Sequence, residues 1–189
     1  TVFKGLGLAN PSAGKNWKLA VEKAAFGNRN DNTITVWNDS LWIIGGYQVG
    51  GLKKYNDTWY SFDGSNWTQA TQGAGFEARY RHSAFVFHDK LWIIGGEVDY
   101  WNNTTGKYDV TLKNDVWYST DGKTWTMVPP SANPPPLIYH SSIVFNDQIW
   151  VIGSGRIWAS PDGIQWNRTD MPYFADNSGK SVVKNDDRV

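Results

Sequence analysis

The 189-residue chain contains no cysteine, so it has neither a disulfide framework nor thiolate chemistry. It has no excess of either charge, with 18 basic and 18 acidic residues. It therefore lacks the net positive charge that is typical of proteins that bind nucleic acid or an anionic membrane. No apolar run approaches the roughly 18 residues of a membrane span, and residues 1–20 lack the features of a signal peptide. We expect a chain that is soluble as written or has lost a leader. The compartment stays open, with an extracellular or periplasmic location favoured over the cytoplasm.

Tryptophan is abundant, with 12 copies, and most copies fall at fixed places in a repeat. An apolar segment that contains tryptophan occurs three times, as Leu41–Gly46, Leu91–Gly96 and Ile149–Ser154. The pattern Ser-x-Asp-Gly-x-x-Trp also occurs three times, as Ser61–Trp67, Ser119–Trp125 and Ser160–Trp166. The apolar segments are spaced 50 and then 58 residues apart. Periods of this size indicate a propeller or a solenoid.

Each repeat is typical of four short antiparallel strands. The apolar runs are rich in aromatic and β-branched residues and are bounded by Gly, Asn or Asp. The second run, Leu91–Ile94 in the best copy, is apolar throughout and predicts a strand covered on both faces. The Asp-Gly pair between the third and fourth runs predicts a tight hairpin. The four-stranded units are expected over residues 32–70, 82–128 and 140–170.

Partial repeats are expected at both ends. Residues 180–189 align without gaps on His82–Leu91 and predict the start of a further blade, whereas residues 1–20 match the second half of one. The predicted fold is therefore all-β: a single β-propeller segment over residues 1–189, with three complete four-stranded antiparallel blades and a half blade at each end.

The repeat resembles the kelch repeat of the galactose-oxidase-like superfamily. In that family a di-glycine closes the second strand, Asn-Asp-x-Trp/Tyr forms the third, and Trp opens the fourth. Asn56–Tyr60 and Asn114–Tyr118 match the third-strand pattern, whereas the third copy has Ser154 in place of the second glycine and lacks the Asn-Asp pair. The hairpins also look like shortened Asp-box turns of sialidase propellers. Copper oxidases of this superfamily use a cysteine-dependent cofactor, which cannot form here, so no cofactor is expected.

Three arrangements would complete the closed ring of blades that a propeller needs. Propellers of this kind usually need six or seven blades, and 189 residues supply at most four. The chain is part of a longer propeller, or two or more chains close a ring, or the terminal halves pair into a fourth blade.

Candidate ligand-binding residues fall into two groups. Residues 97–114 are expected to form a long loop on one end of the propeller, where Glu97, Asp99, Tyr100 and Trp101 suit sugar stacking or a protein hot spot. A loop that only packs on the next blade is the alternative.

The second group is expected at the mouth of the central channel, where the innermost strands begin. Arg79, Arg81 and Tyr139 lie there in the predicted arrangement, and converging arginines suit a carboxylate. His82 and His140 share one repeat position, which favours structural hydrogen bonds. No metal site is expected, because His88 lies roughly 20 Å from His82 at strand rise.

These observations predict a non-catalytic binding scaffold that presents aromatic-rich loops to a protein or glycan. The alternative is a carbohydrate-active enzyme of the sialidase or sialate-mutarotase kind that uses the channel mouth, and a third hypothesis is a pure assembly element. No catalytic residue, nucleic-acid partner or membrane span is predicted, while further blades or a second copy are possible partners. The predicted ligand-binding residues are Arg79, Arg81, Glu97, Asp99, Tyr100, Trp101 and Tyr139.

Overall fold

The computed structural model describes residues 18–48, 53–129, 134, 136–137, 139–153 and 156–169. Every regular element in this part of the chain is a β-strand. Accordingly, these residues include no helix long and apolar enough to cross a membrane. The predicted start of a blade at 180–189 lies outside the described residues, as does all of the predicted half blade at 1–20 except residues 18–20, which form no strand.

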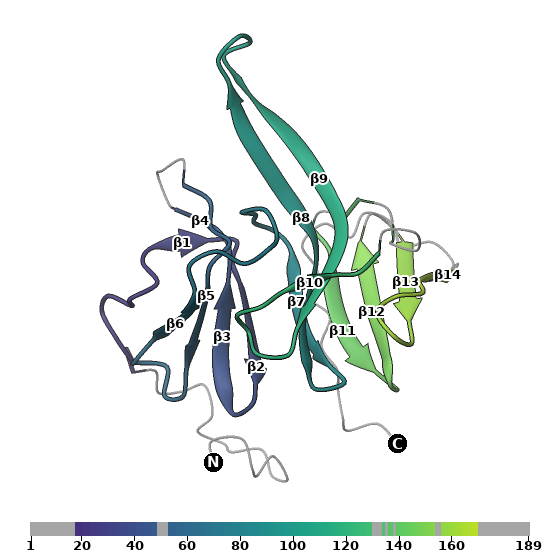
Figure 1. The fold of residues 1–189 in the computed structure, drawn as a ribbon, viewed down its shortest axis with the longest axis horizontal. Helices are drawn as coiled ribbons and strands as arrows, with labels where there is room; N and C mark the ends of the chain where they lie inside the picture. Colours follow the sequence, from purple (N-terminus) through teal and green to yellow (C-terminus); the bar gives the residue numbers. More distant parts are fainter. Residues whose placement is uncertain are drawn as a thin grey trace.

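Three four-stranded antiparallel sheets follow one another along the chain (Figure 1). The first contains β2 (Thr33–Trp37), β3 (Ser40–Ile44), β5 (Thr58–Ser61) and β6 (Thr68–Thr71). The second contains β7 (Ser83–Phe87), β8 (Lys90–Asn102), β9 (Lys107–Ser119) and β10 (Thr126–Met127). The third contains β11 (Ser141–Phe145), β12 (Gln148–Gly153), β13 (Arg156–Ser160) and β14 (Asn167–Thr169). A short pair, β1 (Arg29–Asn30) with β4 (Tyr47–Gln48), lies beside them.

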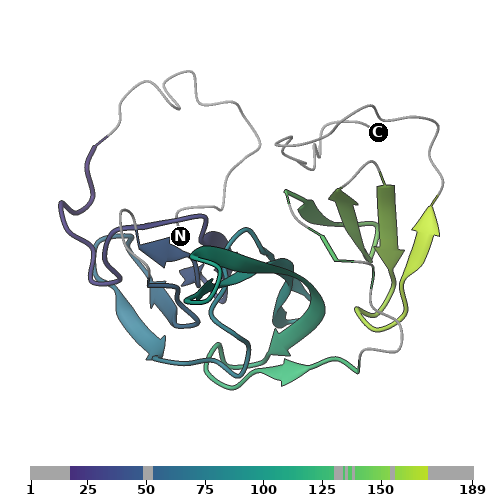
Figure 2. The same ribbon diagram turned by 90° about the horizontal axis from the view of Figure 1, so that it is seen from above.

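The sheets are arranged as blades around a common axis, in an arc that Figure 2 shows from above. Their first strands lie innermost, with β7 packed between β2 and β11. Strand order within each sheet follows chain order, which is the up-and-down meander of a propeller blade. The all-β propeller fold predicted from the repeat is confirmed.

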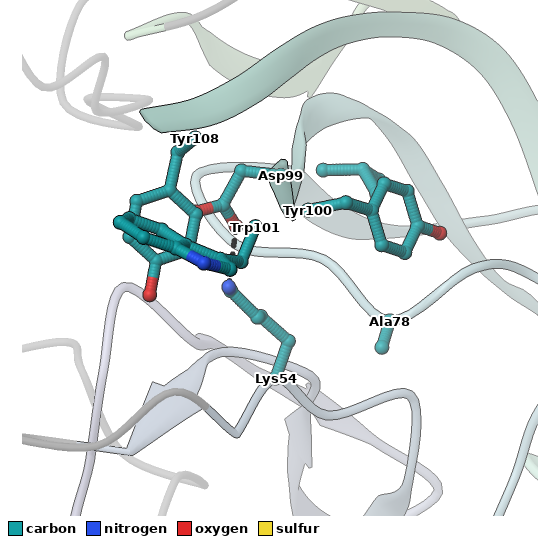
Figure 3. A pocket seen from close by; sticks show the side chains of 7 residues that line it. Lys54, Ala78, Asp99, Tyr100, Trp101 and Tyr108 are labelled. Carbon is teal, nitrogen blue, oxygen red and sulfur yellow. Dashed lines mark ion pairs between the residues drawn. The ribbon is translucent and has the colours of Figure 1, made fainter. Parts of the chain in front are cut away.

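The second blade carries a long hairpin in place of the expected loop. Strands β8 and β9 remain paired as far as Asn102 and Lys107, so the prediction of a loop at 97–114 is wrong. The side chain of Asn102 closes the turn by accepting hydrogen bonds from the amides of Thr104 and Thr105, at 2.9 and 3.1 Å. The hairpin stands clear of the three sheets in Figure 1, and its outer part faces the segment around Lys54 (Figure 3).

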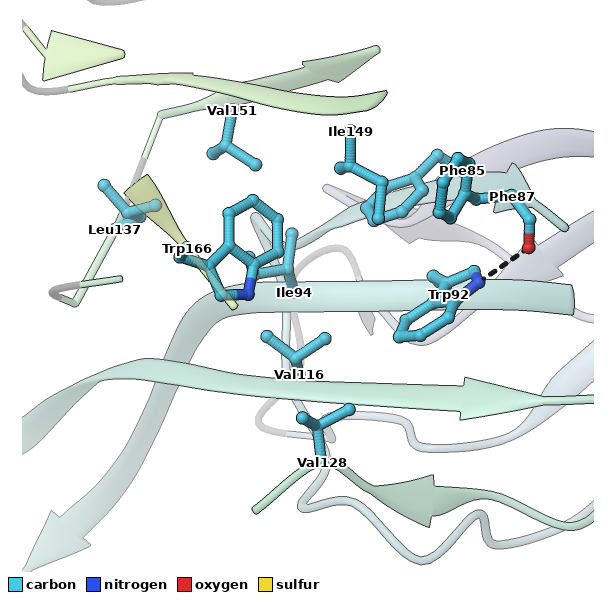
Figure 4. Packing of buried hydrophobic residues seen from close by; sticks show 10 residues of the cluster. All are labelled: Phe85, Phe87, Trp92, Ile94, Val116, Val128, Leu137, Ile149, Val151 and Trp166. Carbon is cyan, nitrogen blue, oxygen red and sulfur yellow. Dashed lines mark hydrogen bonds between the residues drawn. The ribbon is translucent and has the colours of Figure 1, made fainter. Parts of the chain in front are cut away.

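The hydrophobic cores lie between the blades. Strand β8 supplies both of them, because Leu91 and Ile93 face the first blade while Trp92 and Ile94 face the third. This explains why the run Leu91–Ile94 is apolar at every position, as expected from the sequence for a strand covered on both faces. The core between the second and third blades (Figure 4) consists of Phe85, Phe87, Trp92, Ile94, Val116, Val128, Leu137, Ile149, Val151 and Trp166.

In the second and third blades, the glycine of the Ser-x-Asp-Gly turn packs against the preceding blade. Gly122 adopts a positive φ of 72°, and a Cβ at this position would lie 2.1 Å from Trp42 of the first blade. A Cβ on Gly163 would lie 2.5 Å from Trp92 in the same way. These two turns therefore need glycine both for the backbone conformation and for the contact with tryptophan.

Candidate ligand-binding site

The outer part of the β8–β9 hairpin exposes three aromatic side chains. Tyr100 is 59% exposed, Trp101 52% and Tyr108 36%. Trp101 and Tyr108 are directly opposite in the register, so they lie on the same face, where their rings meet edge to face at 5.1 Å. Val110 and Leu112 continue this face along β9 and are also exposed. The result is an apolar strip on a two-stranded ribbon.

A pocket of about 260 Å³ lies between the hairpin and the first blade (Figure 3). Lys54, from the segment that precedes β5, enters it from the side opposite the hairpin. The Lys54 ammonium lies 2.8 Å from Asp99 Oδ1 and 4.8 Å from the centre of the Tyr108 ring. The lining residues are Lys54, Ala78, Val98, Asp99, Tyr100, Trp101 and Tyr108.

The opposite face of the hairpin is fastened to the segment that precedes β7. Tyr100 donates a hydrogen bond to Glu77 Oε1 at 2.9 Å, and Lys113 forms an ion pair with the same carboxylate. The hydrogen bond from Lys113 holds the pKa of Glu77 below its usual value, against the opposing effect of burial. The hydrogen bond to Glu77 in turn raises the pKa of Tyr100. Contacts from both strands therefore hold the ribbon in place.

A second polar cluster lies where the innermost strands begin. Asp31, Arg81 and Tyr139 occupy the same repeat position and all have positive φ, at 51°, 58° and 50°. Arg81 donates to Asp31 at 3.0 Å and to Glu97 at 2.9 Å, and its guanidinium lies 4.8 Å from the Tyr139 ring centre. Tyr80 donates to Glu97 at 2.6 Å, and its pKa is raised by burial and by this bond. The structure thus brings Arg81, Glu97 and Tyr139 together.

Arg79 requires a correction, because it does not line the channel mouth. Its side chain is 0% exposed and makes two hydrogen bonds to Asp115, at 2.6 and 2.8 Å. It also donates to the carbonyl oxygens of Gly95 and Glu77. Four of the five N–H donors of Arg79 are thus occupied, and its full burial keeps the side chain away from a ligand.

Self-comparison of the sequence contained a signal for this role. Arg29 pairs with Asp57 in the first blade as Arg79 pairs with Asp115 in the second. Both arginines follow a phenylalanine by three residues, and the two Phe-x-x-Arg motifs lie 50 residues apart. An arginine that recurs at one repeat position belongs to the scaffold. Arg81 has no such counterpart, because Asp31 occupies its position in the first blade.

Two of the three histidines are also scaffold residues. His82 Nε2 lies 3.1 Å from Thr33 Oγ1, and His140 donates to the carbonyl of Ile94 at 3.2 Å. Burial lowers the pKa of His82 to about 3 and that of His140 to about 4. His88 is exposed and pairs with Asp147. In the described ranges no three His, Cys, Asp or Glu side chains are grouped as metal ligands would be.

The repeat, the blades and their axial arrangement define a β-propeller of the kelch type. The family described as the KLHDC2/KLHL20/DRC7 Kelch-repeats domain matches residues 4–154, and the chain belongs to this kelch-repeat family. A solved structure described as the structure of YjhT is similar in fold, with a TM-score of 0.60 at 14% sequence identity. The match covers 80% of this chain and 55% of that one, so the chain spans about half the length of that protein. No curated protein matches the sequence significantly.

Proposed function

We propose that the protein is a non-catalytic binding scaffold that holds a protein or glycan ligand on hairpin β8–β9 and in the adjoining pocket. The observation that carries this proposal is the exposure of Tyr100, Trp101 and Tyr108 on a ribbon that stands clear of the blades. Aromatic side chains supply large contact areas with few rotatable bonds, and they dominate binding hot spots. Membership of the kelch-repeat family supports a binding role, because such domains generally bind proteins.

The stiffness of the ribbon supports the same role. Its inner part is a fully buried strand, Val98 is only 2% exposed, and ion pairs tether both faces. A surface that is already ordered loses less conformational entropy when it binds. The aromatic tip is therefore preorganised for a ligand.

The apolar strip favours a protein among the two ligand classes. Trp101, Tyr108, Val110 and Leu112 are exposed together on one face. Aromatic rings stack on sugars, but the aliphatic Val110 and Leu112 suit the apolar side chains of a protein better. Contiguous exposed apolar surface commonly marks a protein interface.

A second candidate is a carbohydrate-active enzyme that uses the channel mouth. The observation in its favour is the cluster of Arg81, Glu97, Tyr80 and Tyr139, in which the side chain of Arg81 is 30% exposed and Tyr139 is 49% exposed. Against it, Arg81 already has two carboxylate partners, Asp31 and Glu97. The cluster therefore offers little uncompensated positive charge to an acidic sugar.

Glycan and peptide arrays probed with purified variants test the proposal. We expect Trp101→Ala to weaken the ligands found by about 30-fold or more, as for a hot-spot residue, and Arg81→Ala to leave them bound. Phe62→Ala is the matched control, because Phe62 is an aromatic side chain with 73% exposure on the first blade. Ligands that are lost with Arg81→Ala and kept with Trp101→Ala would overturn the proposal in favour of the channel mouth.

A further inference from the structure

The ammonium group of Lys54 lies in a corner built from two aromatic rings and a carboxylate (Figure 3). Asp99 provides the carboxylate at 2.8 Å, and Tyr108 provides a ring whose centre is 4.8 Å away. Trp101 stands edge to face with Tyr108 at an interplanar angle of 71° and lines the same pocket. Aromatic faces combined with a carboxylate attract ammonium groups through the ring quadrupole and the opposite charge. We call these three residues the ammonium corner.

The lysine that fills this corner comes from another blade, so its presence is separable from the corner itself. All three members of the corner belong to hairpin β8–β9, whereas Lys54 belongs to the segment before β5. Asp99 Oδ1, the oxygen that lies 2.8 Å from the Lys54 ammonium, is fully buried in this arrangement. A second ammonium group therefore reaches it only by taking the place of Lys54.

Burial makes a cation necessary at this position. The side chain of Asp99 is only 11% exposed and that of Lys54 only 17%. A buried carboxylate that loses its partner carries a large desolvation cost, so the corner without Lys54 strongly favours a replacement cation. The pocket of about 260 Å³ extends along the same side chains and leaves space beside Lys54.

We propose that the ammonium corner is a binding site for an alkylammonium group, such as a lysine side chain of a partner protein. Lys54 is the intramolecular competitor that occupies the corner until the partner displaces it. This inference rests on the proposed function, because it specifies the chemical group that a protein ligand presents to the hairpin. The apolar strip then receives the residues that flank the partner's lysine.

Chemical rescue tests the proposal with n-butylammonium, which reproduces the lysine side chain, and with 1-butanol as its neutral counterpart. Two-dimensional NMR titrations report both binding and the folded state of each variant. We expect Lys54→Ala to bind n-butylammonium at least about tenfold more tightly than the unmodified protein does, as expected of a partly desolvated cation–π contact with an ion pair. Lys53→Ala is the matched control and should show no gain, because the Lys53 ammonium lies over Tyr55 instead.

Two further substitutions test whether n-butylammonium binds at the ammonium corner. Adding Asp99→Asn or Trp101→Ala to Lys54→Ala should remove the gain, while Lys54→Arg should keep the corner closed. Equal binding of n-butylammonium and 1-butanol to Lys54→Ala, or binding that survives Asp99→Asn, would overturn the proposal. If the arrays yield ligands that depend on Trp101 but Lys54→Ala shows no gain in n-butylammonium binding, the proposed ammonium site is wrong and the scaffold function stands. If rescue succeeds and no array ligand depends on Trp101, the corner stands and the proposed function fails.

Discussion

Arg79 and Asp115 form a two-point ion pair inside the second blade, with N–O distances of 2.6 and 2.8 Å. Removing one partner leaves an uncompensated charge in a buried place, so we expect Arg79→Leu to lower the free energy of unfolding by about 3 kcal/mol. Urea denaturation of the purified chain measures this change. Ligand binding at the hairpin should be unaffected in the fraction that remains folded.

The third blade suggests the matched control for this pair. It has Leu137 at the position of Arg79, and this leucine is 1% exposed within the core. The double variant Arg79→Leu with Asp115→Asn removes both charges, so it should recover a large part of the stability lost in the single variant. Strictly additive losses in this double-mutant cycle would show that the pair does not stabilise the blade.

Gly122 and Gly64 occupy the same turn position but have different surroundings. Both have positive φ, yet a Cβ on Gly122 would collide with Trp42 at 2.1 Å, whereas one on Gly64 would meet only Leu41 at 3.7 Å. We expect Gly64→Ala to cost about 1–2 kcal/mol from backbone strain alone, and Gly122→Ala to cost about 3 kcal/mol or more because of added overpacking. Thermal and urea unfolding compare the two, and equal losses would contradict the role of tryptophan in joining the blades.

The strands, their order and the blade cores could be predicted because they are encoded locally and repeated. An apolar run such as Leu91–Ile94 forms the second strand of its blade in all three copies, and the Asp-Gly turn sets the next hairpin without help from distant residues. Three copies of each signal marked the positions of the strands. The family match and the sheet topology agree with this prediction of the fold.

The arrangement of the candidate site was harder to predict because it depends on contacts between blades. Polar residues among 97–114 suggested a loop, but cross-strand pairs such as Trp101 with Tyr108 keep the ribbon paired beyond the sheet. Arg79 and Arg81 are two residues apart and chemically identical, yet one is buried against Asp115 and the other is partly exposed at the mouth. In the sequence, the buried arginine differs from the exposed one only in that Arg79 shares its repeat position with Arg29.

The two buried histidines should make stability depend on pH. Burial lowers the pKa of His82 to about 3 and that of His140 to about 4, from 6.5. Below pH 6.5 the unfolded chain therefore binds more protons than the folded one, and stability falls as the pH falls towards 4. The slope should reach up to about 1.4 kcal/mol per pH unit for each histidine. Urea midpoints between pH 7 and pH 4 measure it.

Substitution of the buried histidines tests whether they cause this pH dependence of stability. His82→Gln and His140→Gln should each flatten the pH dependence, because a neutral amide replaces a buried imidazole. A slope that persists after substitution of both buried histidines would assign the effect to carboxylates instead.

The outer flank of the third blade exposes residues whose counterparts are buried in the second. Phe145 is 44% exposed, whereas Phe87 at the same repeat position is 3% exposed. We therefore expect Phe87→Ala to cost about 3–5 kcal/mol and Phe145→Ala no more than about 1–2 kcal/mol, measured by urea unfolding. Equal costs would mean that another surface covers this flank in solution. Light scattering at the same protein concentration would then show whether a second copy supplies that surface, since two chains that close one ring must elute as a dimer.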